Sequence, residues 1–135
     1  MPKTTRDAPR APRRPGEEHA TLLSRFDELA SRIRAGPARE LLQPWLAFAA
    51  DLHAHFAFEE DMLFPAFAQQ NRDARELVRS LVAEHAAARQ LAEEIGLQLR
   101  RQDIRTSTLE VLSDLLREHA EVKNARIYSG SGPGS

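Results

Sequence analysis

One pattern of histidine and carboxylate residues occurs twice in this chain, and the two copies differ at one position. In the first copy Glu59 follows His55 by four residues, whereas in the second copy Lys123 follows His119 at the same interval. Side chains four residues apart on a helix lie on one face, about one turn apart, so a histidine and a glutamate at this spacing can bind one metal ion. The first copy therefore predicts metal ligands, and the second copy lacks the corresponding carboxylate.

Each copy is preceded by another histidine, which directly follows a glutamate. Glu18-His19 comes before the first copy and Glu84-His85 before the second, at nearly equal intervals. A repeat of this length can hold two helices joined by a turn. We interpret the chain as a duplicated helical hairpin in which each helix carries one histidine of the pattern.

Two polar neighbours of the first motif are expected outside the ligand set. His53 precedes His55 by two residues and therefore points about 200° away on a helix, so we expect it at the surface. Glu60 lies about 100° from Glu59, and we expect it to be solvated or to support a ligand from behind.

The apolar residues around these histidines recur in steps of three and four, as in amphipathic helices that bury one face. Gly36-Pro37 predicts the end of the first helix, and Pro65 should kink the end of the second. Asp73 and Ser107 are each followed three residues later by a glutamate, which predicts capped starts for the third and fourth helices. Short connections between four helices predict an all-α, up-down-up-down four-helix bundle.

The four histidines lie at similar heights along these helices. Counted from Gly36-Pro37, His19 and His55 are nearly level, and the mismatches at the other two connections are about three residues, or roughly 5 Å. Burying four imidazoles without partners would cost roughly 1–3 kcal/mol each, whereas a metal ion accepts them as ligands. We therefore predict one metal-binding layer, and its ligands are His19, His55, Glu59, His85 and His119.

Length and composition limit the alternatives. A chain of 135 residues that is 41% hydrophobic fits one domain. The absence of cysteine excludes disulfides, thiolate zinc sites and iron–sulfur clusters, so histidine and carboxylate must hold any metal. No apolar run approaches the length of a membrane span and no secretory signal is recognisable, so we expect a cytoplasmic protein without membrane contact.

The two ends of the chain differ in composition from its middle. Residues 1–16 combine several prolines with an excess of arginine and lysine, which predicts a disordered basic tail. Such a tail could touch nucleic acid or an acidic membrane, but its few charges favour a solubilising arm without a dedicated partner. Residues 129–135 are rich in glycine and serine and predict a flexible tail.

The Glu-His pairs, the His-x3-Glu-Glu-x2-Leu-Phe-Pro run at 55–65 and its altered echo at 119–129 resemble the hemerythrin-like, HHE cation-binding superfamily. The resemblance covers about residues 17–128. It implies a non-heme di-iron centre inside the bundle, bridged by two carboxylates. In that scheme the four histidines match terminal ligands and Glu59 matches one bridging carboxylate.

Two positions depart from the pattern of this family. Arg89 stands where oxygen-carrying members have a second histidine on the third helix, and Lys123 stands where a second bridging carboxylate is expected. An ammonium about 5 Å from a divalent ion would be repelled by about 6–7 kcal/mol at an effective dielectric near 20. Lys123 must therefore turn toward solvent, lose its proton, or displace one metal and pair with Glu59. We favour one metal or an asymmetric pair, with a snorkelling lysine beside a di-iron site as the alternative.

The ligand chemistry and the resemblance together suggest a function. Imidazole and carboxylate suit iron, zinc or manganese, and the resemblance selects iron. We expect a metal-binding protein that binds or senses O2, NO or iron. The alternatives are a redox enzyme acting on peroxide or nitric oxide, for which the chain offers no clear substrate-positioning group, and a metal-free helical module that binds partners.

Overall fold

The computed structural model describes residues 15–128, and the predicted tails lie outside this range except for Pro15 and Gly16, which belong to the first helix. In chain order the elements are α2 (Pro15–Ala35), η1 (Ala38–Leu41), α3 (Leu42–Phe58), η2 (Glu59–Leu63), α4 (Phe64–Ala68), α5 (Arg72–Arg101), α6 (Thr106–Lys123) and η3 (Asn124–Tyr128). No helix in this part of the chain has the length and apolar character needed to cross a membrane.

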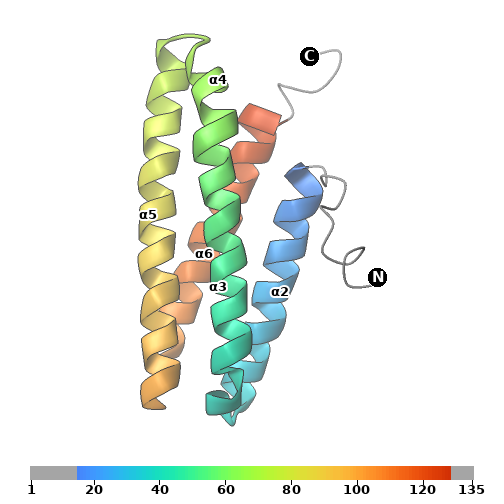
Figure 1. The fold of residues 1–135 in the computed structure, drawn as a ribbon, viewed down its shortest axis with the longest axis vertical. Coiled ribbons are helices and arrows are strands. Elements are labelled where there is room, and N and C mark those ends of the chain that lie inside the picture. Colours follow the sequence, from blue (N-terminus) through green and yellow to red (C-terminus); the bar gives the residue numbers. More distant parts are fainter. Residues whose placement is uncertain (1–14, 129–135) are drawn as a thin grey trace, which may run out of the picture.

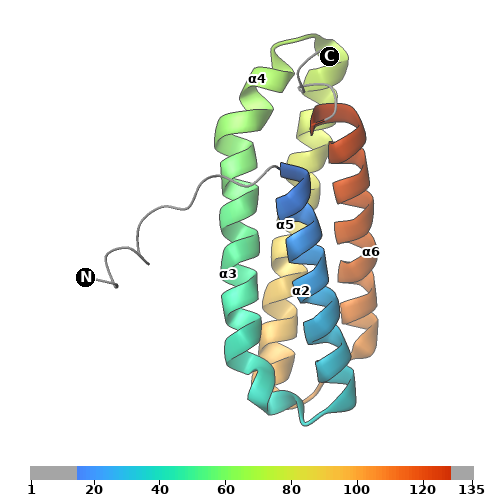
Figure 2. The same cartoon turned by 90° about the vertical axis from the view of Figure 1, so that its right-hand side faces the viewer.

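The long helices form the predicted bundle. Helices α2 and α5 run in one direction, and α3 and α6 run in the other (Figures 1 and 2). Each of them packs against the next in the chain, and α2 also packs against α6, which closes the ring. The prediction of an all-α, up-down-up-down bundle is confirmed.

The first turn forms where the sequence placed it. Helix α2 ends at Ala35, and Gly36 adopts a φ of 68°, a left-handed conformation that glycine reaches without steric cost. The Gly36 N–H donates to the Arg32 carbonyl at 3.0 Å. This glycine stop fixes the turn from which the heights of His19 and His55 follow.

Helices α5 and α6 each start one residue before the predicted position, at Arg72 and Thr106, but the predicted caps were wrong. Asn71 caps α5, because its backbone is extended and its side-chain oxygen accepts from the Ala74 N–H at 2.8 Å. No side chain caps α6, which begins at Thr106. Its start is held instead by Gln98 of α5, whose side chain accepts from the Arg105 N–H at 2.9 Å and donates to Thr108 Oγ1 at 3.0 Å.

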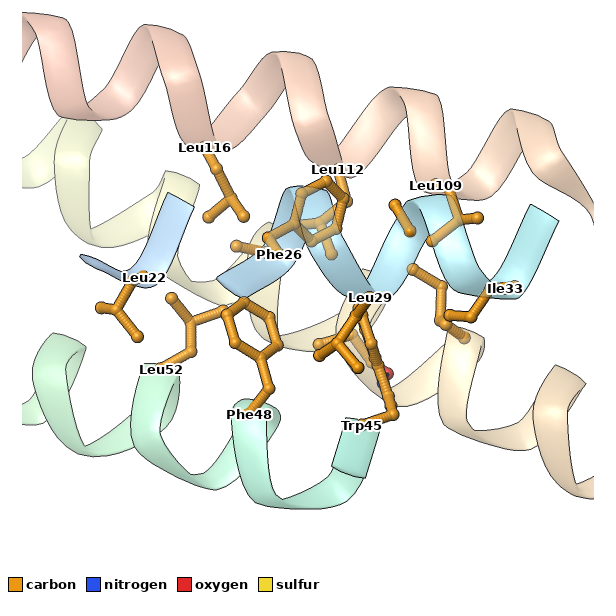
Figure 3. Packing of buried hydrophobic residues seen from close by; sticks show 14 of the residues in the cluster. Leu22, Phe26, Leu29, Ile33, Trp45, Phe48, Leu52, Leu109, Leu112 and Leu116 are labelled. Carbon is orange, nitrogen blue, oxygen red and sulfur yellow. Dashed lines mark hydrogen bonds between the residues drawn. The ribbon is translucent and has the colours of Figure 1, made fainter. Parts of the chain in front are cut away.

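Two apolar clusters fill the bundle. In the larger one Phe26, Trp45 and Phe48 pack between leucines of several helices (Figure 3), and Trp45 Nε1 donates to the Ala92 carbonyl at 2.9 Å. A smaller cluster near the other end contains Phe64, Leu81 and Ile127. The predicted histidine layer lies between the two clusters along α5 and along α6 with η3, so apolar side chains flank it on both sides there; on α2 the larger cluster lies on one side of His19.

Helix α3 continues through a π-helical turn into α4. In η2 the Phe64 N–H bonds to the Glu59 carbonyl, five residues back, and Pro65 follows directly. Proline has no N–H, so Pro65 cannot form the α-helical bond to residue 61, and the irregular turn directly precedes the residue from which a kink was expected. The second copy of the motif also has a π-helical turn, η3, which begins one residue later in the repeat, after Lys123, and forms although residue 129, at the position of Pro65, is a serine.

The capping difference gives a stability test. Asn71→Ala should lower the free energy of unfolding by about 1 kcal/mol, because it removes the side-chain acceptor of the α5 cap. Ser107→Ala, at the exposed position where the sequence predicted a cap, should change it by less than about 0.5 kcal/mol. Urea unfolding followed by circular dichroism measures both, and equal losses would contradict the observed caps.

Candidate metal centre

The five predicted ligands meet inside the bundle. All are buried, and Glu59 and His85 have no exposed surface. The Nε2 atoms of His19 and His55 each lie 3.0 Å from Glu59 Oε2, and His85 Nε2 lies 3.1 Å from Glu59 Oε1. The Glu59 carboxylate is therefore the point on which the imidazoles from three other positions converge.

These residues form two groups that could each hold a metal ion. His19 and His55 make one group with Glu59, and His85 and His119 make the other, with the ligand atoms of each group within 4.8 Å of one another. Ring centroids are 4.8 Å apart in the first histidine pair and 4.6 Å apart in the second. Because Glu59 belongs to both groups, each of its two carboxylate oxygens can face one of the two candidate metal positions.

The outward nitrogens of three histidines are held by carboxylates. The Nδ1 atoms lie 2.5 Å from Glu18 for His55, 2.6 Å from Glu60 for His85 and 2.6 Å from Glu84 for His119. A carboxylate oxygen accepts, so Nδ1 donates, which leaves the lone pair on Nε2 directed into the centre. His19 Nδ1 lies 3.1 Å from Asn124 Oδ1, a neutral counterpart.

The inward nitrogens fit a metal ion. Nε2 of His55, His85 and His119 is buried without a hydrogen-bond partner among the described residues. Two of these atoms approach Glu59 within 3.1 Å, but not in hydrogen-bonding geometry. Unpaired buried nitrogens are costly, whereas imidazole and carboxylate together form a donor set for iron, zinc or manganese. The residues present therefore fit a metal.

Lys123 lies inside the centre. It is 1% exposed, and its Nζ donates to Glu59 Oε1 at 2.5 Å and lies 5.4 Å from the Phe56 ring centroid. The snorkelling alternative is therefore wrong for this structure, because the stem is enclosed in the bundle and the ammonium finds a buried carboxylate. Of the outcomes that the sequence left open, the turn toward solvent is excluded, and Lys123 contacts Glu59.

The pKa values in the centre follow from burial and from this pair. Burial would raise the pKa of Glu59, but hydrogen bonding from His19, the approach of His55 and His85 and the Lys123 charge hold it well below its usual range. Burial, followed by the charge of Lys123, lowers the pKa of His119 to about 2. Burial also lowers the pKa of His19 and of Lys123, which Glu59 opposes.

A family comparison agrees with this geometry. The family model of the hemerythrin HHE cation-binding domain matches residues 16–129. The chain belongs to this family. No curated protein and no solved structure matches it. For this hemerythrin domain, the two groups that share Glu59 are the candidate cation ligands.

Arg89 occupies the position of the missing second histidine of the third helix. It provides no inward nitrogen; its Nη1 donates to Glu60 Oε2 at 3.2 Å, and its Nε donates to His53 Nδ1 at 3.0 Å. Glu60 in turn holds His85, and His53 is exposed. The expected surface position of His53 is thus confirmed, and Glu60 contacts His85, a predicted ligand.

The sequence did not predict that the carboxylates of Glu18 and Glu84 hydrogen-bond to histidines of the next helix. Each directly precedes a predicted ligand histidine, yet each contacts the histidine of the next helix, His55 or His119. The signal was the repeated Glu-His pair itself, whose two glutamates hold equivalent histidines in the two hairpins of the hemerythrin domain. Glu60 and Asn124 are likewise equivalent and hold His85 and His19.

A small cavity adjoins the histidines on the side of α2, α3 and α6. Its volume is about 20 Å³. The polar residues around it are His19, His55, His119 and Lys123, and the apolar ones are Leu22, Leu23, Leu52, Phe56, Leu116 and Ala120. A cavity needs about 10–15 Å³ to hold one water molecule, so this one has room for one molecule of that size.

Removing a supporting carboxylate should weaken metal binding. Glu18→Ala should lower metal affinity by roughly 10–100-fold, because His55 loses the partner that fixes its orientation. Competition with a chromogenic chelator measures the affinity. Glu118→Ala is the control, since Glu118 also precedes a predicted ligand histidine but is exposed. Equal affinities for the two variants would contradict the supporting role of Glu18.

Proposed function

We propose that this hemerythrin domain binds non-heme iron through His19, His55, Glu59, His85 and His119, and that it binds or senses O2, NO or iron. The observation that carries the proposal is the orientation of the imidazoles. Their outer nitrogens are held by side chains from neighbouring helices, and three inner nitrogens are buried without hydrogen-bond partners among the described residues. Such preorganisation is typical of metal ligands.

The donor set and the family support iron, while zinc stays compatible with the same ligands. Iron in such a site supplies a change of oxidation state and open coordination positions. The protein's own residues supply the rest. The outer carboxylates keep the imidazoles in one tautomer, and the apolar clusters on either side of the layer exclude bulk water.

The size of the cavity supports a small ligand. About 20 Å³ next to His19, His55 and His119 has room for one water-sized molecule. Its lining is mainly leucine, phenylalanine and alanine side chains, which suit an uncharged gas. These features favour binding or sensing of a diatomic molecule over turnover of a larger substrate. The cytoplasmic location expected from the sequence stays a prediction.

Metal content tests the proposal directly. Protein purified from iron-supplemented cells should contain at least one iron ion per chain by elemental analysis, because the centre offers five donors. His55→Ala should lose most of this metal, whereas His53→Ala, which changes an exposed histidine two residues away, should retain it. Correctly folded wild-type protein with almost no metal would refute the proposal.

The cavity gives a separate test of ligand binding. Ala120→Leu should fill it and weaken NO binding to the ferrous protein by roughly tenfold or more, since overpacking costs about 1–3 kcal/mol. Val122→Leu alters the exposed face of the same helix and serves as the control. Electron paramagnetic resonance during NO titration measures binding. Unchanged affinity in Ala120→Leu, with metal retained, would show that NO binds elsewhere.

A further inference from the structure

Lys123 is a buried cation at the position of the repeat that corresponds to Glu59. It is 1% exposed and ion-paired with Glu59, which has no exposed surface. A metal-binding role for the histidines does not by itself explain an ammonium group among them. A lysine so deeply buried is rare unless a partner compensates its charge.

We infer that the Lys123 ammonium is the resident second cation of this centre: it stands in for one metal ion, so that the domain holds a single metal ion and keeps Glu59 neutralised when no metal is bound. The metal count in this inference rests on the proposed function. The neutralisation of Glu59 does not, because it concerns two side chains of the protein alone.

The position of the Lys123 ammonium identifies which of the two candidate metal sites it occupies. Lys123 Nζ lies 2.5 Å from Glu59 Oε1, the oxygen that lies 3.1 Å from His85 Nε2. A metal bound to Oε1 would sit about 2.0–2.2 Å from that oxygen. Two cations sharing one carboxylate oxygen at these distances would repel strongly. The group of Glu59, His85 and His119 therefore already contains its cation.

The other group keeps its access to a metal. His19 and His55 approach Glu59 at Oε2, each at 3.0 Å, which is the oxygen turned away from the ion pair. Glu59 can accept from Lys123 on one oxygen and bind a metal with the other. The inference thus narrows the five ligands of the proposed function to three: His19, His55 and Glu59 Oε2 hold the single metal ion next to the small cavity, and His85 and His119 face the ammonium position instead.

The same ion pair has a consequence for the metal-free protein. A wholly buried carboxylate without a cation is strongly destabilising, and in a centre with two carboxylates bound metals must supply the positive charge. Here Lys123 supplies it from within the chain. The fold should therefore depend much less on metal than the fold of a variant in which position 123 is a glutamate.

Charge variants at position 123 test the inference with two readouts. Metal-free and zinc-reconstituted or iron-reconstituted proteins are compared by elemental analysis after gel filtration and by thermal unfolding. Wild type should bind one ion per chain and unfold cooperatively without metal. Lys123→Glu should bind two ions per chain, and its metal-free form should melt well below wild type and recover when metal is added.

Lys123→Met separates charge from packing, since it keeps much of the stem but removes the ammonium. Its metal-free form should melt below wild type, and Lys123→Arg, which keeps a cation, should fold and bind one ion. Arg126→Glu, an exposed charge reversal in η3, should change neither the melting temperature nor the metal count. If Lys123→Met does not fold at all, the behaviour of Lys123→Arg decides the charge assignment.

The outcomes distinguish this inference from the proposed function. Two ions per wild-type chain would overturn the inference and leave the proposed function intact. Folded wild-type protein without metal in either reconstitution would refute the proposed function, while the melting temperatures would still test the ion pair. Metal-free Lys123→Met as stable as wild type, or Lys123→Arg that fails to fold, would overturn the role of Lys123 as the neutralising cation.

Discussion

The buried carboxylate of Glu59 is the constraint on which the rest of this bundle depends. It has no exposed surface, and its nearest cation is Lys123 at 2.5 Å. At that distance two unit charges attract by about 6–7 kcal/mol at an effective dielectric near 20, comparable with the lower end of a domain's total stability. Much of this attraction offsets the cost of removing both charges from water. The helices must therefore bring groups that compensate Glu59 to one level, and this requirement fixes their register.

The imidazoles around Glu59 are held on more than one side, which makes the centre rigid before any ligand arrives. The outer nitrogen of His85 bonds to Glu60, and Phe56 stacks on its ring with centroids 3.9 Å apart. Phe64 stacks on the same imidazole at 5.4 Å. Ring orientation and tautomer are thus set by neighbouring helices rather than by the metal. In a site built this way, metal binding does not carry the entropic cost of ordering the ligand side chains.

The sequence predicted the bundle and the residues of the candidate site because helices are regular. Steps of three and four placed one histidine per helix on the inner face, and a constant rise brought His19 level with His55. The sequence could not predict contacts that depend on how neighbouring helices are rotated, so Glu18 was seen beside His19 although it contacts His55. It also predicted the wrong caps for two helices, because Asn71 caps α5 and Gln98 of the preceding helix holds the start of α6. For Lys123 the sequence left several orientations open, because helical spacing does not determine whether a long side chain points into the bundle or toward solvent.

The two hairpins share a backbone design but differ in charge around the centre. Both place a π-helical turn after the motif, in η2 and η3. Where the first has Glu59 and Glu60, the second has Lys123 and Asn124, and both differences remove negative charge. A centre with fewer carboxylates can compensate less positive charge from bound metal, so both differences lower the metal charge that the centre can hold. Asn124 also gives His19 a neutral partner where Glu60 gives His85 an anionic one, and a neutral partner makes an imidazole a weaker base. The duplication thus supplies symmetric positions for ligands, and the charges at its second motif make the resulting centre asymmetric.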